Sequence, residues 1–134
     1  MSAEEMGRIR EYIQINGMKC WTLFDSGARN TYITPQVASH LTTTELPKAI
    51  KTALGGGVKK ASKAALLVGR LEGHDISTNA YVINDIGLDE GGKKIDVLFG
   101  ALAMQQWGIR LVPKEERLDL THFPKEFVEF SSDG

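Results

Sequence analysis

The clearest pattern in the chain is an alternation of apolar and polar residues near its start. Over residues 8–15 the isoleucines fall on one face, because successive side chains of a β-strand point to opposite sides. Asn16-Gly17 follows, and this dipeptide favours the two-residue turn of a β-hairpin. The return strand, Met18 to Phe24, is mostly apolar in its second half, which predicts burial on both faces at its end. That strand stops abruptly at Asp25.

Shorter segments of the same kinds fill the rest of the chain. A short strand at 31–33 precedes an expected helix from Pro35 to Leu41, with Thr34 as its N-cap and proline at the first helical position. We expect a second helix over 101–107, which Gly108 ends, and loops over 42–47 and 85–94. Further strands are expected over 48–54, 58–68, 67–71, 76–83, 95–99, 109–113 and 117–120. Residues 61–65 are rich in alanine, so a helix is the alternative there. The pattern predicts a mainly β protein with one or two short helices.

Composition limits the function classes. The 134 residues suit one domain, 1–134, with its core over about 8–120. With 16 basic and 17 acidic residues the net charge is -1, so no general field attracts nucleic acid. No apolar run approaches the roughly 20 residues that a membrane-spanning helix needs. Met1 to Arg10 has no apolar segment typical of a signal peptide, and we expect a cytoplasmic location.

Metal and thiol chemistry find little support in the sequence. A single cysteine, Cys20, cannot form an internal disulfide or a cysteine-rich zinc site, and its apolar strand predicts a buried, inert thiol. His40, His74 and His122 are scattered and lack the spacing of metal ligands. We therefore expect no metal and no cofactor.

The segment that carries chemistry is Phe24-Asp25-Ser26-Gly27-Ala28. Burial disfavours the charged form of a carboxyl group, so an aspartate at the end of an apolar strand usually has a partner or a chemical role. Glycine after the hydroxyl residue lets another backbone or a substrate approach closely. A purely structural alternative is a turn at the strand end, held by a hydrogen bond to the aspartate side chain.

This segment resembles the active-site sequence of the retropepsin-like aspartic peptidases, in which two apolar residues precede Asp, Thr or Ser, Gly and Ala. Val97-Leu98-Phe99-Gly100 resembles the second signature of that family, and Gly100 lies 75 residues after Asp25. Gly55-Gly56-Gly57, between two extended arms, stands where the family carries its flap, a mobile hairpin. The resemblance implies a closed β-barrel of the acid-protease type.

The resemblance also implies a homodimer, because the chain holds the aspartate motif once. Asp25 of each subunit would form a catalytic pair that shares one proton, and a water between them would attack a peptide bond of a protein or peptide substrate. Ser26 would brace the two loops across the twofold axis, and Gly27 would offer its backbone to the substrate. Activity is expected at mildly acidic pH.

Two departures and two alternatives accompany this interpretation. Arg29-Asn30 follows Ala28 where the family often has Ser or Asp, so these residues are expected to alter the substrate contacts. Within 121–134, the alternating Phe127-Val128-Glu129-Phe130 is a candidate strand at the dimer interface. A retropepsin-like domain that only dimerises or binds peptides is one alternative. A small β-barrel interaction module with an incidental Asp-Ser-Gly turn is the other.

Overall fold

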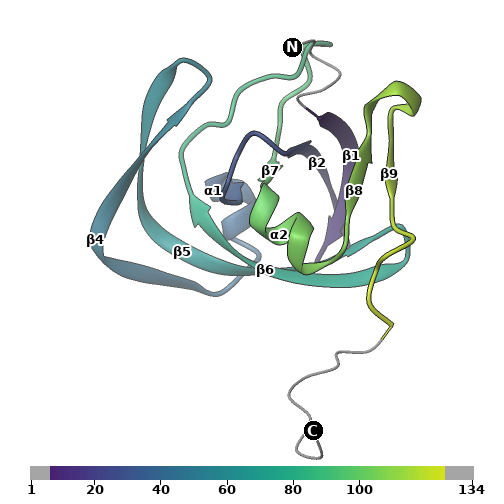
Figure 1. Cartoon of the computed structure of the whole chain (residues 1–134). Helices are drawn as coiled ribbons and strands as arrows, with labels where there is room; N and C mark the ends of the chain where they lie inside the picture. The colour runs from purple at the N-terminus through teal and green to yellow at the C-terminus, as the bar shows by residue number, and fades with distance from the viewer. Residues whose placement is uncertain (1–6, 126–134) are drawn as a thin grey trace, which may run out of the picture.

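The alternating segments form one sheet of seven strands in the computed structural model, which describes residues 7–125 (Figure 1). Its strands are β1 (Arg8–Ile15), β2 (Met18–Asp25), β3 (Tyr32–Ile33), β4 (Thr43–Leu54), β5 (Gly57–Leu71), β6 (His74–Val82) and β7 (Val97–Phe99). Two short helices, α1 (Pro35–Ala38) and α2 (Ala101–Gln106), follow β3 and β7. A separate hairpin of β8 (Arg110–Val112) and β9 (Arg117–Asp119) brackets a 3-10 turn over Pro113–Glu115. The expectation of a mainly β protein with short helices is confirmed.

The order of the strands brings distant parts of the sequence together. The sheet runs β1-β2-β7-β3-β6-β5-β4, and β2 pairs in parallel with β7. At the far side of the sheet, β1 also pairs with β5, through Gln14 and Arg70. A side chain at Gly69 would place its Cβ 2.8 Å from the Gln14 carbonyl oxygen, so the glycine allows this close approach of two strands.

The main core holds the ends of β2 and β7 in place. Phe24 and Phe99, both fully buried, pack with their ring centroids 5.0 Å apart. Met104 of α2 belongs to the same cluster. Trp107, at the end of α2, stacks on Phe123 at 5.5 Å and donates a hydrogen bond from Nε1 to the Ser77 carbonyl oxygen. The core therefore fixes the helix that follows Gly100 against the strand that ends in Asp25.

Several element boundaries differ from the sequence-based expectation. Residues 42–47 were expected as a loop, but β4 begins at Thr43. Pro47 cannot donate a ladder hydrogen bond, and it is accommodated where the β4–β5 register shifts between Glu45 and Ile50. The two strands expected over 58–68 and 67–71 are one continuous strand, β5, and residues 61–65 within it are extended.

Other segments are shorter than expected. Helix α1 ends at Ala38 instead of Leu41, and Thr34 makes no side-chain capping hydrogen bond. Strand β7 begins at Val97, because the Ile95 backbone N–H binds the Gly87 carbonyl oxygen of the preceding loop instead of a strand neighbour. Pro113 belongs to the 3-10 turn and not to β8. The candidate dimer strand at Phe127–Phe130 lies outside the described residues. No helix among residues 7–125 is long and apolar enough to cross a membrane.

A half-buried acid on β1 makes the stability of the fold depend on pH. Glu11 lies between the buried Ile9 and Ile13 along the strand. Burial, with a hydrogen bond and repulsion from Glu72, raises the pKa of Glu11 from 4.5 to about 7. Between these values the folded protein retains a proton that the unfolded chain has released, so the free energy of unfolding falls as pH rises.

We expect that fall to be about 1 kcal/mol between pH 4.5 and 7, since solvent screens a partly exposed group. Urea unfolding of the wild type at about pH 5 and about pH 8 measures it, and Glu11→Gln should remove most of the difference. If the Glu11→Gln variant kept the wild-type pH dependence, the Glu11–Glu72 pair would not be its source.

Candidate active site

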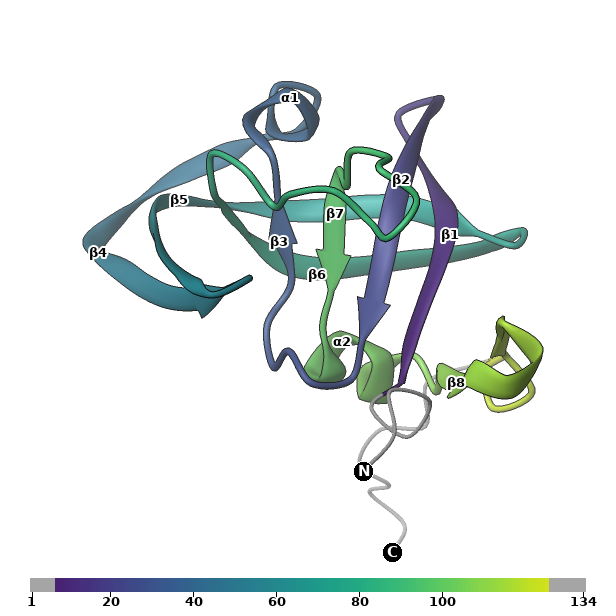
Figure 2. The same cartoon turned by 90° about the horizontal axis from the view of Figure 1, so that it is seen from above.

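Asp25 is placed by the strand that carries it. Alternation along β2 puts Trp21, Leu23 and Asp25 on one face, while Thr22 and Phe24 point into the core on the other. Strand β2 lies between β1 and β7, so Asp25 emerges beside two neighbours that are themselves hydrogen-bonded in the sheet (Figure 2). Such a central strand end gives a side chain little freedom to move.

The Asp25 carboxylate is nearly buried but retains room for a further partner. Its residue is 8% exposed. Oδ1 accepts a hydrogen bond of 2.8 Å from the Gly27 backbone N–H, and Oδ2 lies 3.5 Å from Nε of Arg8. Each carboxylate oxygen has two lone pairs, so both can accept another hydrogen bond. Arg8 is more than half exposed, so its ion pair with Asp25 is screened by solvent and weak.

The loop after Asp25 is braced from two sides. Both the backbone N–H and the hydroxyl of Ser26 donate to the Gly7 carbonyl oxygen, at 3.1 and 3.3 Å. The Ala28 and Arg29 carbonyl oxygens accept hydrogen bonds from the backbone N–H groups of Ala101 and Leu102, at 2.7 and 3.1 Å. The first turn of α2 therefore holds the loop with groups that have no partner inside the helix.

Gly100 joins the two sequence motifs. Its backbone N–H donates to Thr31 Oγ1 at 3.1 Å. A Cβ at this position would lie 2.1 Å from the Asn30 carbonyl oxygen, a distance that only glycine avoids. Val97, Leu98 and Phe99 are buried in β7 directly before it. The structure thus brings the segment 97–100 against the segment 25–30.

The flap segment is a β-hairpin. Gly55 and Gly56, both with positive φ, form the turn between β4 and β5, and residues 55–57 are exposed at its tip. Ile50 and Leu54 of β4 pack against a second hydrophobic cluster, and Leu23 and Ala28 pack against the same cluster. The hairpin therefore borders the same cluster as Leu23, which lies on the Asp25 face of β2, while its tip projects to the side of the sheet (Figure 1).

The remaining predicted residues divide into two groups. Arg29 is exposed and Asn30 is half-buried, and both contribute main-chain atoms to the contact with the segment 100–102. Cys20 is fully buried, and burial raises the pKa of its thiol to about 11, in agreement with an inert side chain. Among residues 7–125, no three His, Cys, Asp or Glu side chains gather in a way that could hold a metal ion.

Sequence reasoning missed Arg8 as a neighbour of Asp25. The signal was present, since a two-residue Asn16-Gly17 turn pairs Ile15 with Met18, and counting outward along both strands pairs Arg8 with Asp25. The role expected for Ser26, a contact across a dimer axis, stays a prediction. In the single chain its hydroxyl binds Gly7.

Comparison with known proteins gives the family and the fold. Residues 12–102 match the family model described as aspartyl protease. No curated protein matches significantly. The retroviral protease-like domain of Ddi1 from Leishmania major is similar in structure, with a TM-score of 0.63 and 18% sequence identity, over 87% of this chain and 90% of that one. EIAV protease in complex with the inhibitor HBY-793 has a TM-score of 0.57 and 17% identity, over 84% of this chain and 99% of that one.

Proposed function

Because this chain belongs to the aspartyl protease family and has a retropepsin-like fold, we propose that it is a homodimeric aspartic endopeptidase. The observation that carries the proposal is Asp25, a nearly buried carboxylate at the end of a central strand, in an Asp-Ser-Gly loop braced by α2. The chain contains this motif once, so the second carboxylate comes from an identical subunit.

The pair of carboxylates performs the chemistry. Two carboxyl groups a few ångströms apart share one proton, because both cannot ionise together. The ionised Asp25 removes a proton from a water as its oxygen attacks the scissile carbonyl carbon. The protonated Asp25 of the other subunit donates its proton to the carbonyl oxygen. When the C–N bond breaks, one carboxyl group gives its proton to the leaving nitrogen. The other carboxylate takes a proton from a hydroxyl of the tetrahedral intermediate, which becomes the new carboxylic acid, so the pair again holds one proton.

The substrate is an extended peptide between the flap and the Asp25 face of the sheet. Main-chain hydrogen bonds to Gly27 and to the hairpin tip, Gly55 to Gly57, add the peptide as a strand, while pockets receive alternate side chains. Arg29 and Asn30 lie at the edge of this groove, because their loop begins at the catalytic residue. Closure of the hairpin excludes water from the bond that is cleaved.

The same family assignment supports a closed barrel as the finer description of the fold. The β1–β5 pairing at Gln14 and Arg70 and the close approach at Gly69 support it, because they join the first strand of the sheet to the sixth in its order. A barrel leaves few free strand edges, which protects a sheet protein from edge-to-edge aggregation.

A domain that dimerises or binds peptides without cleaving them is the competing function. The observation that favours it is the pair of contacts that Asp25 makes within its own chain, to Gly27 and Arg8. Those contacts fit a purely structural turn as well as a catalytic one.

Mixing subunits distinguishes the two functions. Wild-type protein at a fixed concentration is incubated with a ninefold excess of the Asp25→Asn variant, and cleavage of an unstructured protein is then measured. If each active site needs two Asp25 residues, random pairing lowers the rate to about one tenth. A catalyst that acts as a single chain would keep its full rate, and a non-cleaving domain would show none at any ratio.

One hydrogen bond to the flap has a measurable consequence. The hydroxyl of Tyr32, a buried residue of β3, lies 2.9 Å from Thr52 Oγ1 of β4. Tyr32→Phe keeps the ring and removes this bond, so the arm of the flap loses a fixed point. We expect KM to rise about three- to tenfold with little change in kcat, as loss of one hydrogen bond implies.

Tyr81→Phe is the matched control, since the Tyr81 ring lies 6.1 Å from that of Tyr32 and its hydroxyl makes no hydrogen bond within residues 7–125. KM and kcat of the Tyr32→Phe and Tyr81→Phe variants are compared by steady-state kinetics. Equal effects on KM from both tyrosines would show that the bond to Thr52 does not position the flap.

A further inference from the structure

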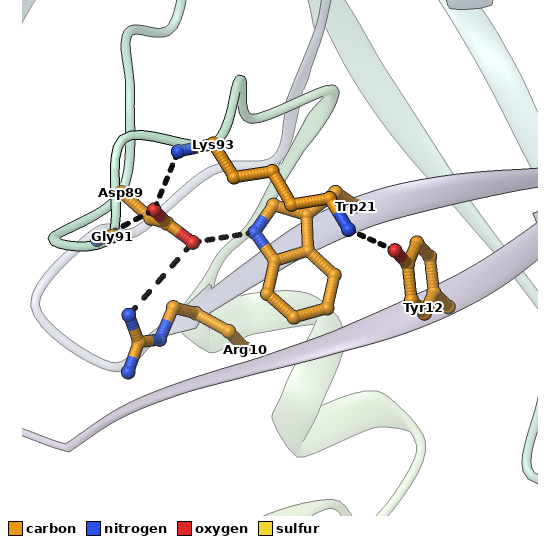
Figure 3. Close-up of polar contacts among 6 residues, drawn as sticks. All are labelled: Arg10, Tyr12, Trp21, Asp89, Gly91 and Lys93. Atoms are coloured by element: carbon orange, nitrogen blue, oxygen red, sulfur yellow. Dashed lines mark hydrogen bonds and ion pairs between the residues drawn. The ribbon is translucent and has the colours of Figure 1, made fainter.

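A carboxylate far from Asp25 in sequence fastens the loop over residues 84–96 to the first hairpin (Figure 3). Asp89 Oδ1 accepts hydrogen bonds from the backbone N–H groups of Gly91 and Lys93, both at 2.8 Å. Asp89 Oδ2 accepts a hydrogen bond of 2.7 Å from Trp21 Nε1 and forms an ion pair with Arg10 at 3.8 Å. The Asp89 side chain is only 5% exposed, so these contacts enclose it.

Lys93 completes this cluster, which we call the Asp89 anchor and which comprises Arg10, Tyr12, Trp21, Asp89 and Lys93. The Lys93 ammonium lies 4.4 Å from the centroid of the Tyr12 ring and 4.3 Å from that of Trp21. It also donates a hydrogen bond to the Tyr12 hydroxyl. The two rings themselves pack at 4.7 Å. Both ends of the loop's central turn are therefore attached to β1 and β2.

The anchor lies on the same side of the sheet as Asp25. In the β1–β2 register, Arg8 is opposite Asp25, Arg10 is opposite Leu23, and Tyr12 is opposite Trp21. Directly opposed residues of an antiparallel pair point to the same face, so these three pairs form a ladder that leads from the anchor to the catalytic residue. Leu23 is two strand residues, about 7 Å, from Asp25.

A cavity of about 510 Å³ opens along this ladder. Its apolar wall includes Trp21 and Leu23 of β2, Leu88 of the anchored loop and Ile95. Leu88 is 66% exposed, and its neighbour Asp89 fixes its place in the loop. A cavity of this size, lined by both apolar and charged residues, can receive a long side chain of a ligand.

In the described part of the chain, ion pairs neutralise some of the charged side chains that line the cavity and leave others without an opposite charge. Its two arginines are both paired, Arg8 with Asp25 and Arg10 with Asp89. Glu90 and Glu116 line it as well, from the loop and from the β8–β9 hairpin, and within residues 7–125 neither forms an ion pair. A side chain with an apolar stem and a positive end matches this combination, because its stem packs on the wall while its charge meets the two carboxylates.

We propose that Asp89 is a positioning residue that holds Leu88 and Glu90 in the wall of this cavity, and that the cavity binds a lysine or arginine side chain of the peptide substrate. This inference rests on the proposed peptidase function and names the substrate class. Arg10 forms an ion pair with Asp89, so its positive charge is offset there and not by Glu90 or Glu116.

The first experiment is a cleavage profile of the intact protein. A library of unstructured peptides is digested, and the products are sequenced by mass spectrometry. We expect lysine and arginine to be enriched about fivefold at one fixed position near the scissile bond, as two surface charges imply.

The Glu90→Gln/Glu116→Gln variant should lose the enrichment, whereas Glu115→Gln, on the same hairpin but outside the cavity, should keep it. Cleavage without any basic preference, or a preference that survives the double substitution, overturns the inference.

Asp89→Asn tests the positioning role. Its matched control is Asp85→Asn, because Asp85 in the same loop accepts a similar hydrogen bond from Gly87 N–H at 3.1 Å but does not contact Trp21. We expect Asp89→Asn to raise KM for basic peptides about tenfold, to leave kcat nearly unchanged and to shift Trp21 fluorescence, whereas Asp85→Asn does none of these. Equal KM values in the two variants overturn the positioning role.

A binding measurement separates this inference from the proposed function. The Asp25→Asn protein is titrated with two fluorescein-labelled hexapeptides that differ only in one lysine or norleucine. Tighter binding of the lysine peptide that fades at high salt supports the cavity assignment even when no variant cleaves any peptide. Equal binding of both peptides overturns it even when cleavage occurs.

Discussion

Replacing Asp25 with asparagine should lower kcat at least about 10³-fold, since the variant loses the group that both removes and donates protons. Asparagine has nearly the same shape, and its oxygen can still accept the hydrogen bond from Gly27, which is 2.8 Å long in the wild type. The substitution also removes the ion pair with the exposed Arg8, which is worth less than about 1 kcal/mol. The variant should therefore remain folded.

Asp85→Asn provides a close control. Asp85 accepts the same type of bond from the glycine two residues on, but it lies in an exposed loop. The rate of peptide cleavage and the urea unfolding curve are measured for both variants. We expect both to unfold near the wild-type midpoint and only Asp25→Asn to lose activity. Cleavage by purified Asp25→Asn protein at the wild-type rate would exclude Asp25 as the catalyst.

Replacing Gly100 with alanine should destabilise the protein by about 3 kcal/mol, a large share of the stability of an ordinary domain. The added Cβ would meet three backbone atoms of the neighbouring loop: the Asn30 carbonyl oxygen at 2.1 Å, the Asn30 carbonyl carbon at 2.6 Å and the Arg29 carbonyl oxygen at 2.8 Å. Backbone atoms cannot swing aside as the end of a long side chain can. The loop of residues 25–30 must move away from α2.

Gly57→Ala is the control, because a Cβ there would meet its nearest atom, the Leu54 carbonyl oxygen, at an ordinary 3.9 Å. Thermal unfolding should show a clearly lower Tm for Gly100→Ala and little change for Gly57→Ala. An alanine in place of Gly100 that leaves Tm unchanged would mean that the two motifs do not touch as described.

The local parts of the fold could be predicted from the sequence. The Asn16-Gly17 turn and the alternation around it specify β1 and β2 with their register, and that register alone places Arg8 opposite Asp25. Gly108, with φ +63, ends α2 where a C-terminal glycine was expected. Each of these features depends on residues that are close in sequence.

The errors have physical causes that single residues do not reveal. Pro47 suggested a loop, but a shift in strand register tolerates it inside β4. Alanines at 61–65 favour a helix on propensity, but pairing on both sides, with β4 and β6, decides in favour of a strand. Tertiary hydrogen bonds outweigh the small differences in local preference.

The candidate site was predictable only in part. Asp25 and Gly100 could be named from their motifs, but the contact between Gly100 and Asn30 depends on the parallel pairing of β2 with β7. The bond from Trp21 to Asp89 crosses 68 residues and depends on where the loop after β6 folds back. No local pattern encodes such a contact, because the sheet order determines which segments meet.

The most direct test of a shared catalytic pair is the distance between the two Asp25 carboxylates in a crystal structure of the assembled protein at mildly acidic pH. We predict a twofold axis between the two loops of residues 25–28 and a closest oxygen–oxygen distance of about 3 Å, short enough to share one proton. Two subunits whose Asp25 carboxylates lie more than about 10 Å apart, each paired only with its own Arg8, would contradict it, since at that distance neither a proton nor a water can be shared between them.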